Sequence, residues 1–283
     1  MYLEKGSNFL VSYALKYFKQ YQILDYFECE ELTFVNYLGN VFMNYYDCPY
    51  HNCIHAIDVM NASAYIISCG LQEKMTQLEI ISLLFASLCH DVGHPGVNSM
   101  FLTEIQSQEA ITYNDKAVLE NLHAALTFKL LNKPNSNFMK NATPENRKKF
   151  RARVIELILA TDLGMHAHWL TKFKAAVAEE ELDMHKENDK NLVFNMVIKA
   201  ADIGHGAKKI ELHKKFSRLV LEEFYTQGRY EQMHGIPISK LCDRKESVSA
   251  SQKGFLQYLV SPMYVALGNF LDSKEFDENL LAN

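Results

Sequence analysis

Apolar residues recur at spacings of three and four along almost the whole chain, and this periodicity is the strongest constraint on the fold. Two examples are the sets Leu10, Tyr13, Ala14, Phe18 and Val154, Leu157, Ile158. Such spacing places apolar side chains on one face of an α-helix, whereas a half-buried strand needs strict alternation. The sequence contains no convincing alternating run. We therefore predict an all-α fold, built as a compact domain of many helices.

The scarcity of turn-forming residues agrees with long helices. The chain has 12 glycines and 6 prolines in 283 residues, whereas average usage would give about 34 such residues. The breaks between periodic stretches are short and polar, near residues 47–49, 93–96, 133–137, 204–206 and 242–251. A charged stretch, Glu179 to Lys190, is followed at once by renewed apolar periodicity. We predict the end of a surface helix and a loop there, and one domain over residues 1–283.

Composition excludes several classes of protein. The formal net charge of -5, with 48% hydrophobic and 22% charged residues, is close to a globular average and does not indicate a nucleic-acid partner. The longest uncharged stretch, Gly254 to Leu271, contains Pro262 and other residues that a membrane span disfavours. The six cysteines include no C-x-x-C pair and are expected to be reduced thiols. We expect a cytoplasmic protein, with any membrane or organelle targeting signal outside these residues; the oligomeric state is not predicted.

Two histidines follow the break at Pro49. His51 and His55 lie four apart in the segment HNCIHAIDV, where a helix is predicted to begin. A spacing of four puts both imidazoles on one face of that helix. Surface or capping histidines would explain this pair equally well when it is taken alone.

Two further segments end an apolar helix on polar residues. His90 and Asp91 follow the predicted helix 78–89, which must break before Pro95, and Asp202 follows the apolar run 192–201. Burial of an ionised carboxylate is costly unless it is paired or binds a cation, so these residues suit a metal site. The alternatives are a histidine that interacts with a helix dipole and an aspartate that caps a helix.

Three separated segments thus offer one set of metal ligands, namely His55, His90, Asp91 and Asp202. Imidazole and carboxylate ligands together suit zinc, whereas carboxylate and water suit magnesium or manganese. We predict two adjacent divalent ions bridged by Asp91. A water held between them would be acidic enough to act as hydroxide near neutral pH and could attack phosphorus. His51 is not needed as a ligand, so it is the candidate general acid for the leaving oxygen.

At this point the motifs become specific. In order along the chain they are YHNCIHAIDV at Tyr50, HDVGHPGVN at His90, YNDKAVLENLHAA at Tyr113, ILATDL at Ile158, KAADIGH at Lys199 and SQKGFLQYLVSP at Ser251. Together they resemble the catalytic domain of the class I cyclic nucleotide phosphodiesterases, within the HD-domain metal hydrolases. The resemblance runs from about Tyr50 to Phe270 and is closest to the cAMP-selective animal enzymes.

The resemblance implies a role for each matching residue. His51 corresponds to the proton donor to O3′, and His55, His90, Asp91 and Asp202 correspond to the tight metal site, usually zinc, with Asp91 also touching a second ion, usually magnesium. The residues that organise metal-bound waters in the family correspond to His94, Glu120, His123 and Thr161. From the residues alone, Glu120 and His123 would be assigned to an exposed face of a helix over 117–130, and Thr161 to a helix end.

The last motif implies the purine site. Gln252 matches the family's purine-binding glutamine, and Phe255 matches the aromatic residue that stacks on the base. A carboxamide offers a donor and an acceptor in one plane, and a ring offers a flat apolar face. By the same resemblance, Val220 forms the other side of the base clamp and Tyr50 lines the same cleft.

Three positions depart from the family pattern. Ser99 stands where an asparagine is usual, with Asn98 one position earlier, and Phe216 stands where tryptophan is common. His205 replaces the asparagine of cAMP-selective relatives, and some dual-specificity members also carry histidine there. The resemblance therefore implies hydrolysis of cAMP, and His205 adds cGMP as a second expected substrate.

The expected architecture has three helical subdomains, at about residues 1–98, 99–172 and 173–283, which meet at one deep cleft holding two metal ions. Two other functions stay open at this stage. One is an HD-domain nucleotidase or nucleoside triphosphohydrolase, which would not need Gln252. The other is a catalytically silent module that binds a cyclic nucleotide or a partner protein without turnover.

Overall fold

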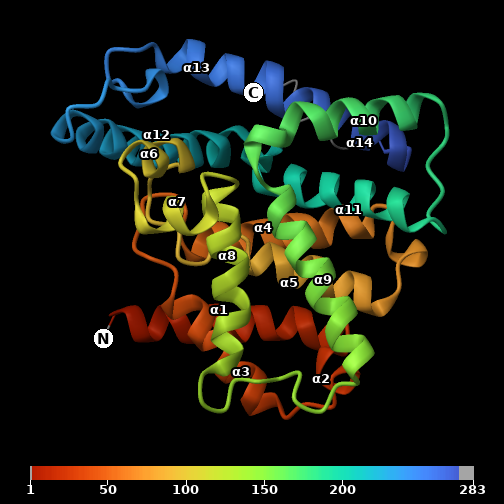
Figure 1. Cartoon of the computed structure of the whole chain (residues 1–283). Helices are drawn as coiled ribbons and strands as arrows, with labels where there is room; N and C mark the ends of the chain where they lie inside the picture. Colours follow the sequence, from red (N-terminus) through yellow and green to blue (C-terminus); the bar gives the residue numbers. More distant parts are fainter. Residues whose placement is uncertain (1, 274–283) are drawn as a thin grey trace.

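The computed structural model describes residues 2–273, and within that range it contains helices and no β-strand (Figure 1). This confirms the predicted all-α class. No helix in these residues combines the length and the apolar character that a membrane crossing requires. The α-helices are α1 (Tyr2–Gln20), α2 (Ile23–Tyr26), α3 (Glu31–Met43), α4 (Cys53–Ser68), α5 (Gln77–Cys89), α6 (Ser99–Glu104), α7 (Gln108–Tyr113), α8 (Val118–Lys129), α9 (Pro144–Ala160), α10 (His166–Ala178), α11 (Glu187–Asp202), α12 (Ile210–Met233), α13 (Val248–Phe255) and α14 (Ser261–Leu271).

Short helical turns connect several of these helices. Five are 3₁₀ turns within the described range: η1 (Gln72–Lys74), η2 (Leu130–Asn132), η3 (Leu163–Met165), η4 (Gly204–Ala207) and η5 (Lys240–Cys242). The sixth segment, η6 (Leu256–Val260), is a π-helix.

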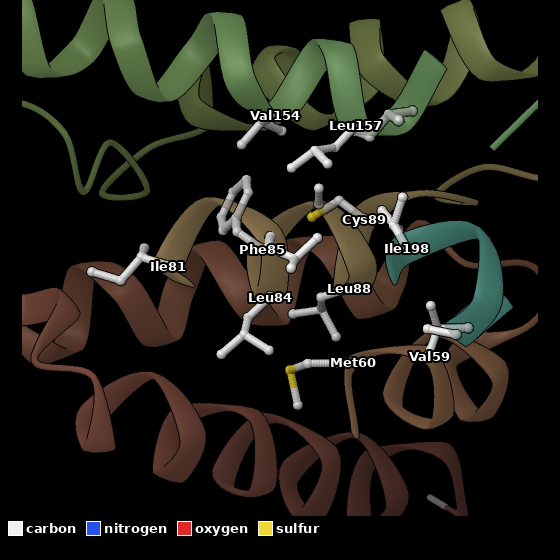
Figure 2. Packing of buried hydrophobic residues seen from close by; sticks show 14 of the residues in the cluster. Val59, Met60, Ile81, Leu84, Phe85, Leu88, Cys89, Val154, Leu157 and Ile198 are labelled. Carbon is white, nitrogen blue, oxygen red and sulfur yellow. The ribbon is translucent and has the colours of Figure 1, made fainter. Parts of the chain in front are cut away.

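Helix α5 lies at the centre of the fold, packed against α4 and α9, while α11 packs against α4 (Figure 1). Figure 2 shows Phe85 and Cys89 of α5 on the side of α9, and Leu84 on the side of Met60 from α4. One hydrophobic cluster extends from Leu10 to Leu267, and a smaller one lies around α6 to α8. The division into three subdomains stays a prediction.

The sequence of α5 explains its central place. Thr76 and Glu79 form a reciprocal capping box that starts the helix, and every residue from Glu79 to Cys89 is buried. The ring of Phe85 lies 5.0 Å from that of Phe150 and 5.4 Å from that of Tyr37. The helix therefore ends inside the protein, and this placement delivers His90 and Asp91 to a buried position.

The predicted breaks are largely observed. Gly93 and Gly96 adopt φ angles of 80° and 76°, which glycine tolerates best, and they form the turn after α5. The break predicted for residues 242–251 is shorter than expected. Helix α13 already begins at Val248, because the Ser247 side chain accepts a hydrogen bond from the Ala250 amide at 3.3 Å and caps the helix.

Helices α13 and α14 are joined through the π-helical segment into one continuous helix. A π segment adds one residue to a helical turn, so it changes which side chains face a given side. After it, Val260, Met263 and Leu267 are buried in the main hydrophobic cluster. Before it, Gln252 and Phe255 are half-buried and contact Ser217 and His205 instead.

Candidate active site

Four predicted ligands converge from the ends of three helices. His55 lies in the first turn of α4, whose start is capped by Asn52, and Asp202 is the last residue of α11. His90 and Asp91 follow α5 directly. One ligand atom from each of these four side chains lies within 4.8 Å of those from the others, so the group can hold a metal ion. The structure thus brings the three predicted ligand segments together, and their role as metal ligands stays a prediction.

The individual contacts are tight. The Nε2 atoms of His55 and His90 lie 3.1 and 3.2 Å from Asp202 Oδ1. The same two atoms lie 3.4 and 3.1 Å from Asp91 Oδ2. His90 Nδ1 donates a hydrogen bond to the Ser87 carbonyl at 2.9 Å, which fixes the ring and leaves Nε2 directed at the carboxylates.

The electrostatics of this cluster favour ionised carboxylates. Burial opposes ionisation of Asp91 and Asp202, but the imidazoles of His90 and His55 outweigh it and hold both pKa values below their usual range. Two buried carboxylates with convergent imidazoles form a donor set that suits a divalent cation.

A second group adjoins the first through Asp91. Asp91, His94 and His123 also place ligand atoms within 4.8 Å of one another. His123 Nδ1 donates to the Val92 carbonyl at 2.9 Å, and its Nε2 lies 3.6 Å from Asp91 Oδ1. Both histidines are buried, so the assignment of His123 to an exposed helix face from residues alone is wrong.

Glu120 supports the presence of a cation beside this group. Its Oε2 atom is buried and has no hydrogen-bond partner in the described residues. Burial, together with the charges of Asp162, Asp91 and Asp202, raises the pKa of Glu120 to about 7. A buried carboxyl among three other carboxylates is the environment that a second divalent ion would stabilise, so the residues present fit two ions. Thr161 is the residue that caps the end of α9. Its hydroxyl donates a hydrogen bond to the Ile158 carbonyl at 2.7 Å.

His51 lies just before Asn52, the N-cap of α4, so the prediction that His51 and His55 share one helix face is wrong. Instead, its ring stacks on that of His94 at 4.0 Å between centroids. His51 Nδ1 forms a short hydrogen bond with Glu223 Oε1.

Glu223 was not predicted from the sequence, and it holds the His51 segment through several contacts. Its Oε2 accepts hydrogen bonds from the backbone amides of Tyr50 and His51, at 2.9 and 3.1 Å. Burial raises the pKa of Glu223, but its hydrogen bond and ion pair with His51 dominate and lower it to about 2. Burial lowers the pKa of His51, but its hydrogen bond to the Glu223 carboxylate and the charges of nearby carboxylates outweigh burial and raise the pKa.

Several residues assigned to the purine site lie near Tyr50 or near one another. The rings of His205 and Phe255 stack at 5.1 Å between centroids, and Tyr50 lies 6.1 Å from His205. His205 Nδ1 lies 3.1 Å from His213 Nδ1. Burial, with nearby cationic groups, lowers the pKa of His205 to about 3, so its imidazole is neutral near pH 7.

Gln252 is held from α12. The Ser217 hydroxyl donates a hydrogen bond to Gln252 Oε1 at 2.9 Å, and Val220 lies on α12 close in sequence to Ser217, half-buried. Phe216 lies 6.1 Å from Tyr50, ring to ring, on the same helix. The role of Val220 as the second side of a base clamp stays a prediction.

Comparison with known proteins identifies the family. The sequence profile described as 3′5′-cyclic nucleotide phosphodiesterase matches residues 50–281 of this chain. The chain belongs to this family. The predicted resemblance to class I cyclic nucleotide phosphodiesterases is therefore confirmed.

Individual relatives agree with this family. The chain is 37% identical over 254 residues to a probable 3′,5′-cyclic-AMP phosphodiesterase, pde-4, of Caenorhabditis elegans, covering 87% of this chain and 38% of that protein. It is 36% identical over 246 residues to a dual 3′,5′-cyclic-AMP and -GMP phosphodiesterase beta of Plasmodium falciparum, covering 86% of this chain and 22% of that protein. The chain thus spans well under half of the length of these relatives.

A solved structure has the same fold. The phosphodiesterase domain of the RhoPDE fusion protein from the choanoflagellate Salpingoeca rosetta superimposes with a TM-score of 0.90 at 26% identity, covering 97% of this chain and 90% of that one. The helical arrangement around the candidate site is therefore that of a phosphodiesterase domain in this family.

The departure at Ser99 has a local structural solution. Asn98 caps α6 by accepting a hydrogen bond from the Phe101 amide at 2.9 Å, and the Ser99 hydroxyl accepts one from the Leu119 amide at 3.3 Å. The two residues thus join the loop after α5 to α6 and α8, and the metal-ligand cluster is formed with this pair in place.

Proposed function

We propose that this chain hydrolyses 3′,5′-cyclic nucleotides to 5′-nucleoside monophosphates. The observation that carries the proposal is the juxtaposition of a buried cluster of four metal ligands with the His51–Glu223 pair. One group can hold cations that activate water, and the other can deliver a proton to a leaving oxygen. Membership of the phosphodiesterase family supports the reaction class.

We assign the ligands as the family resemblance implies. His55, His90, Asp91 and Asp202 would hold one divalent cation, proposed to be zinc, and Asp91 would share a second, proposed to be magnesium or manganese. Two such ions would supply the Lewis acidity that lowers the pKa of a water molecule towards neutrality. His94, Glu120, His123 and Thr161 would orient the waters around the second ion by hydrogen bonds.

His51 is proposed as the general acid. Attack of water on phosphorus breaks the P–O3′ bond, and the departing O3′ then takes a proton. Because Nδ1 of His51 is bound to Glu223, Nε2 is the ring atom available to deliver it. The Glu223 carboxylate stabilises the imidazolium before transfer and, through two backbone amides, keeps this segment in place.

The groups that would read the purine can act in either direction. Ser217 can donate to the oxygen of the Gln252 carboxamide or accept from its nitrogen, because a hydroxyl is both donor and acceptor. His205 and His213, whose Nδ1 atoms face each other, can likewise exchange roles as neutral imidazoles. Neither pair locks Gln252 or His205 into one orientation. This supports hydrolysis of both purine nucleotides, and we propose cAMP as the main substrate on the basis of the family resemblance.

The decisive test is steady-state hydrolysis of cAMP and cGMP, with product analysis. We expect 5′-AMP and 5′-GMP, loss of activity after chelation, and recovery on adding zinc with magnesium. Binding of either nucleotide without turnover would instead support a silent module. Hydrolysis of nucleoside triphosphates or monophosphates but not of cyclic nucleotides would support the other HD-domain hydrolases.

A matched pair of variants separates the two assigned roles. His51→Ala should retain its metals and lose about 10²–10⁴-fold in rate, the usual range for a general acid. Asp202→Ala should lose both turnover and bound metal, because its partners in the buried cluster are left uncompensated. Full metal content in Asp202→Ala would contradict the ligand assignment, and metal loss in His51→Ala would contradict the general-acid role.

A further inference from the structure

Lys199 is a buried lysine on α11 that the proposed reaction does not use. The residue is only 2% exposed to solvent. Lys199 precedes Asp202 by three residues on the same helix, so both side chains lie on one side of α11. Burying an ammonium is costly, and an apolar side chain would fill the same space, so its contacts call for an explanation.

The Lys199 ammonium binds the end of another helix. Its Nζ donates to the Ala160 carbonyl at 2.9 Å and to the Asp162 carbonyl at 3.0 Å. Helix α9 ends at Ala160, and carbonyls at such an end lack partners within the helix. The two accepting carbonyls flank Thr161, so the ammonium fixes the backbone on both sides of that residue.

The charges around Lys199 connect it to the metal-ligand cluster. Burial lowers its pKa, and the nearby carboxylates of Asp202, Asp162 and Glu120 favour its charged form. These carboxylates come from the end of α11, the residue after the α9 cap, and α8. The Lys199 ammonium therefore bonds to the end of α9 and interacts electrostatically with carboxylates of α8 and α11.

We propose that Lys199 is a positioning residue for the second divalent cation, acting by fixing the end of α9 at Thr161 against the end of α11 at Asp202. This rests on the proposed function, in which Thr161 and Glu120 orient the waters of that ion. Lys199 touches neither the substrate nor an ion. Its loss should loosen the second site while the ligands of the tight site remain in place.

The test measures metal binding without any nucleotide. In zinc-loaded protein, Mn²⁺ is titrated and the free ion is counted by electron paramagnetic resonance. Lys199→Met should retain its zinc and bind Mn²⁺ about 10-fold more weakly, as is typical when a partner outside the ligands themselves is removed. In activity assays, the Mg²⁺ concentration for half-maximal rate should rise similarly, with the KM for nucleotide unchanged.

A control on the same helix separates positioning from general stability. Lys190 pairs with Glu79 at 2.9 Å near the other end of α11. Lys190→Met should lower thermal stability and leave Mn²⁺ binding as in the wild type. Equal weakening in both variants, or wild-type Mn²⁺ affinity in Lys199→Met, would overturn the proposal.

A second variant keeps the test decisive if Lys199→Met does not fold. Lys199→Gln retains a hydrogen-bond donor but removes the charge and shortens the reach, so Mn²⁺ binding should weaken several-fold. Wild-type Mn²⁺ affinity in Lys199→Gln would overturn the proposal. Because no nucleotide is present, failure of the proposed hydrolysis would leave this result interpretable.

Discussion

Helices α5 and α12 differ in how much of each is buried and in the chemistry of the buried side chains. In α5, the eleven residues from Glu79 to Cys89 are buried, and most are apolar. In the 24 residues of α12, the buried residues are all polar or glycine: His213, Ser217, Glu223, Gln227, Gly228 and Glu231. The first helix contributes mainly hydrophobic stabilisation, whereas the second contributes hydrogen bonds.

Each of these polar side chains on α12 reaches a different segment. Glu223 holds the backbone of Tyr50 and His51, Gln227 Oε1 accepts from the Asn98 amide at 2.8 Å, and Glu231 accepts from the Ser239 amide at 2.8 Å. Ser217 donates a hydrogen bond to Gln252, and His213 contacts His205. Helix α12 thus aligns separate parts of the site, and the comparison predicts that changes in α5 cost stability while changes in α12 cost catalysis or recognition.

The largest effect is expected for Phe85→Ala in α5. Removing a fully buried aromatic ring should destabilise the protein by about 3–5 kcal/mol, through lost burial and the cavity left behind. The urea midpoint should fall, while kcat/KM per folded molecule stays at the wild-type value. A loss of kcat/KM with an unchanged midpoint would break the distinction between the helices.

Glu223→Gln should show the opposite pattern. Loss of a hydrogen bond to a charged group costs about 1.5–3 kcal/mol, which would lower kcat/KM by about 10- to 150-fold. A general acid must be protonated, so activity falls as pH rises through the pKa of His51, which Glu223 raises. The alkaline limb of the pH profile should therefore move to lower pH.

The neighbouring Glu222→Gln is the control for this pH profile. Glu222 is exposed and lies 3.5 Å from Arg244 rather than from His51. Its pH profile should match the wild type. An unmoved alkaline limb in Glu223→Gln would show that this carboxylate does not set the protonation of His51.

Gly228→Ala tests whether α12 also has a steric role. A Cβ there would lie 2.3 Å from the Cys242 carbonyl oxygen, so the backbone of η5 must shift. Overpacking of this kind costs about 1–3 kcal/mol, which thermal unfolding would detect. Gly39→Ala on α3 has no atom within 4 Å of the added Cβ and should be neutral or slightly stabilising. Equal unfolding temperatures in both variants would show that the contact at Gly228 relaxes freely.

The smallest effect is expected for Ser217→Ala. Loss of its hydrogen bond to Gln252 should cost about 0.5–1.5 kcal/mol, raising KM by about 2- to 10-fold. Because a hydroxyl serves either orientation of the carboxamide, KM for cAMP and for cGMP should rise together. A change for one nucleotide alone would show that Ser217 selects an orientation of Gln252.

The same contrast explains what could be predicted from the sequence. Apolar periodicity determines where α5 lies, and His90 and Asp91 are recognisable because they end an apolar helix. Glu223 gives no such signal, since it follows Glu222 in a charged helix and its partners are more than 170 residues earlier. Lys199 is similar, because its two accepting carbonyls lie at the end of another helix and just beyond it, more than 35 residues earlier in the chain. Glu120 and His123 were assigned to the site only by family resemblance.

Because of the π-helical segment, the number of residues between α13 and α14 determines which way the proposed purine-binding side chains face. Each helical residue turns the chain by about 100°. Deleting Gln257 would therefore rotate Gln252 and Phe255 together, away from Ser217 and His205, while Val260 and Met263 kept their places in the hydrophobic cluster. Deletion of this one residue would change the orientation of both side chains at once, which no single substitution in α13 can do.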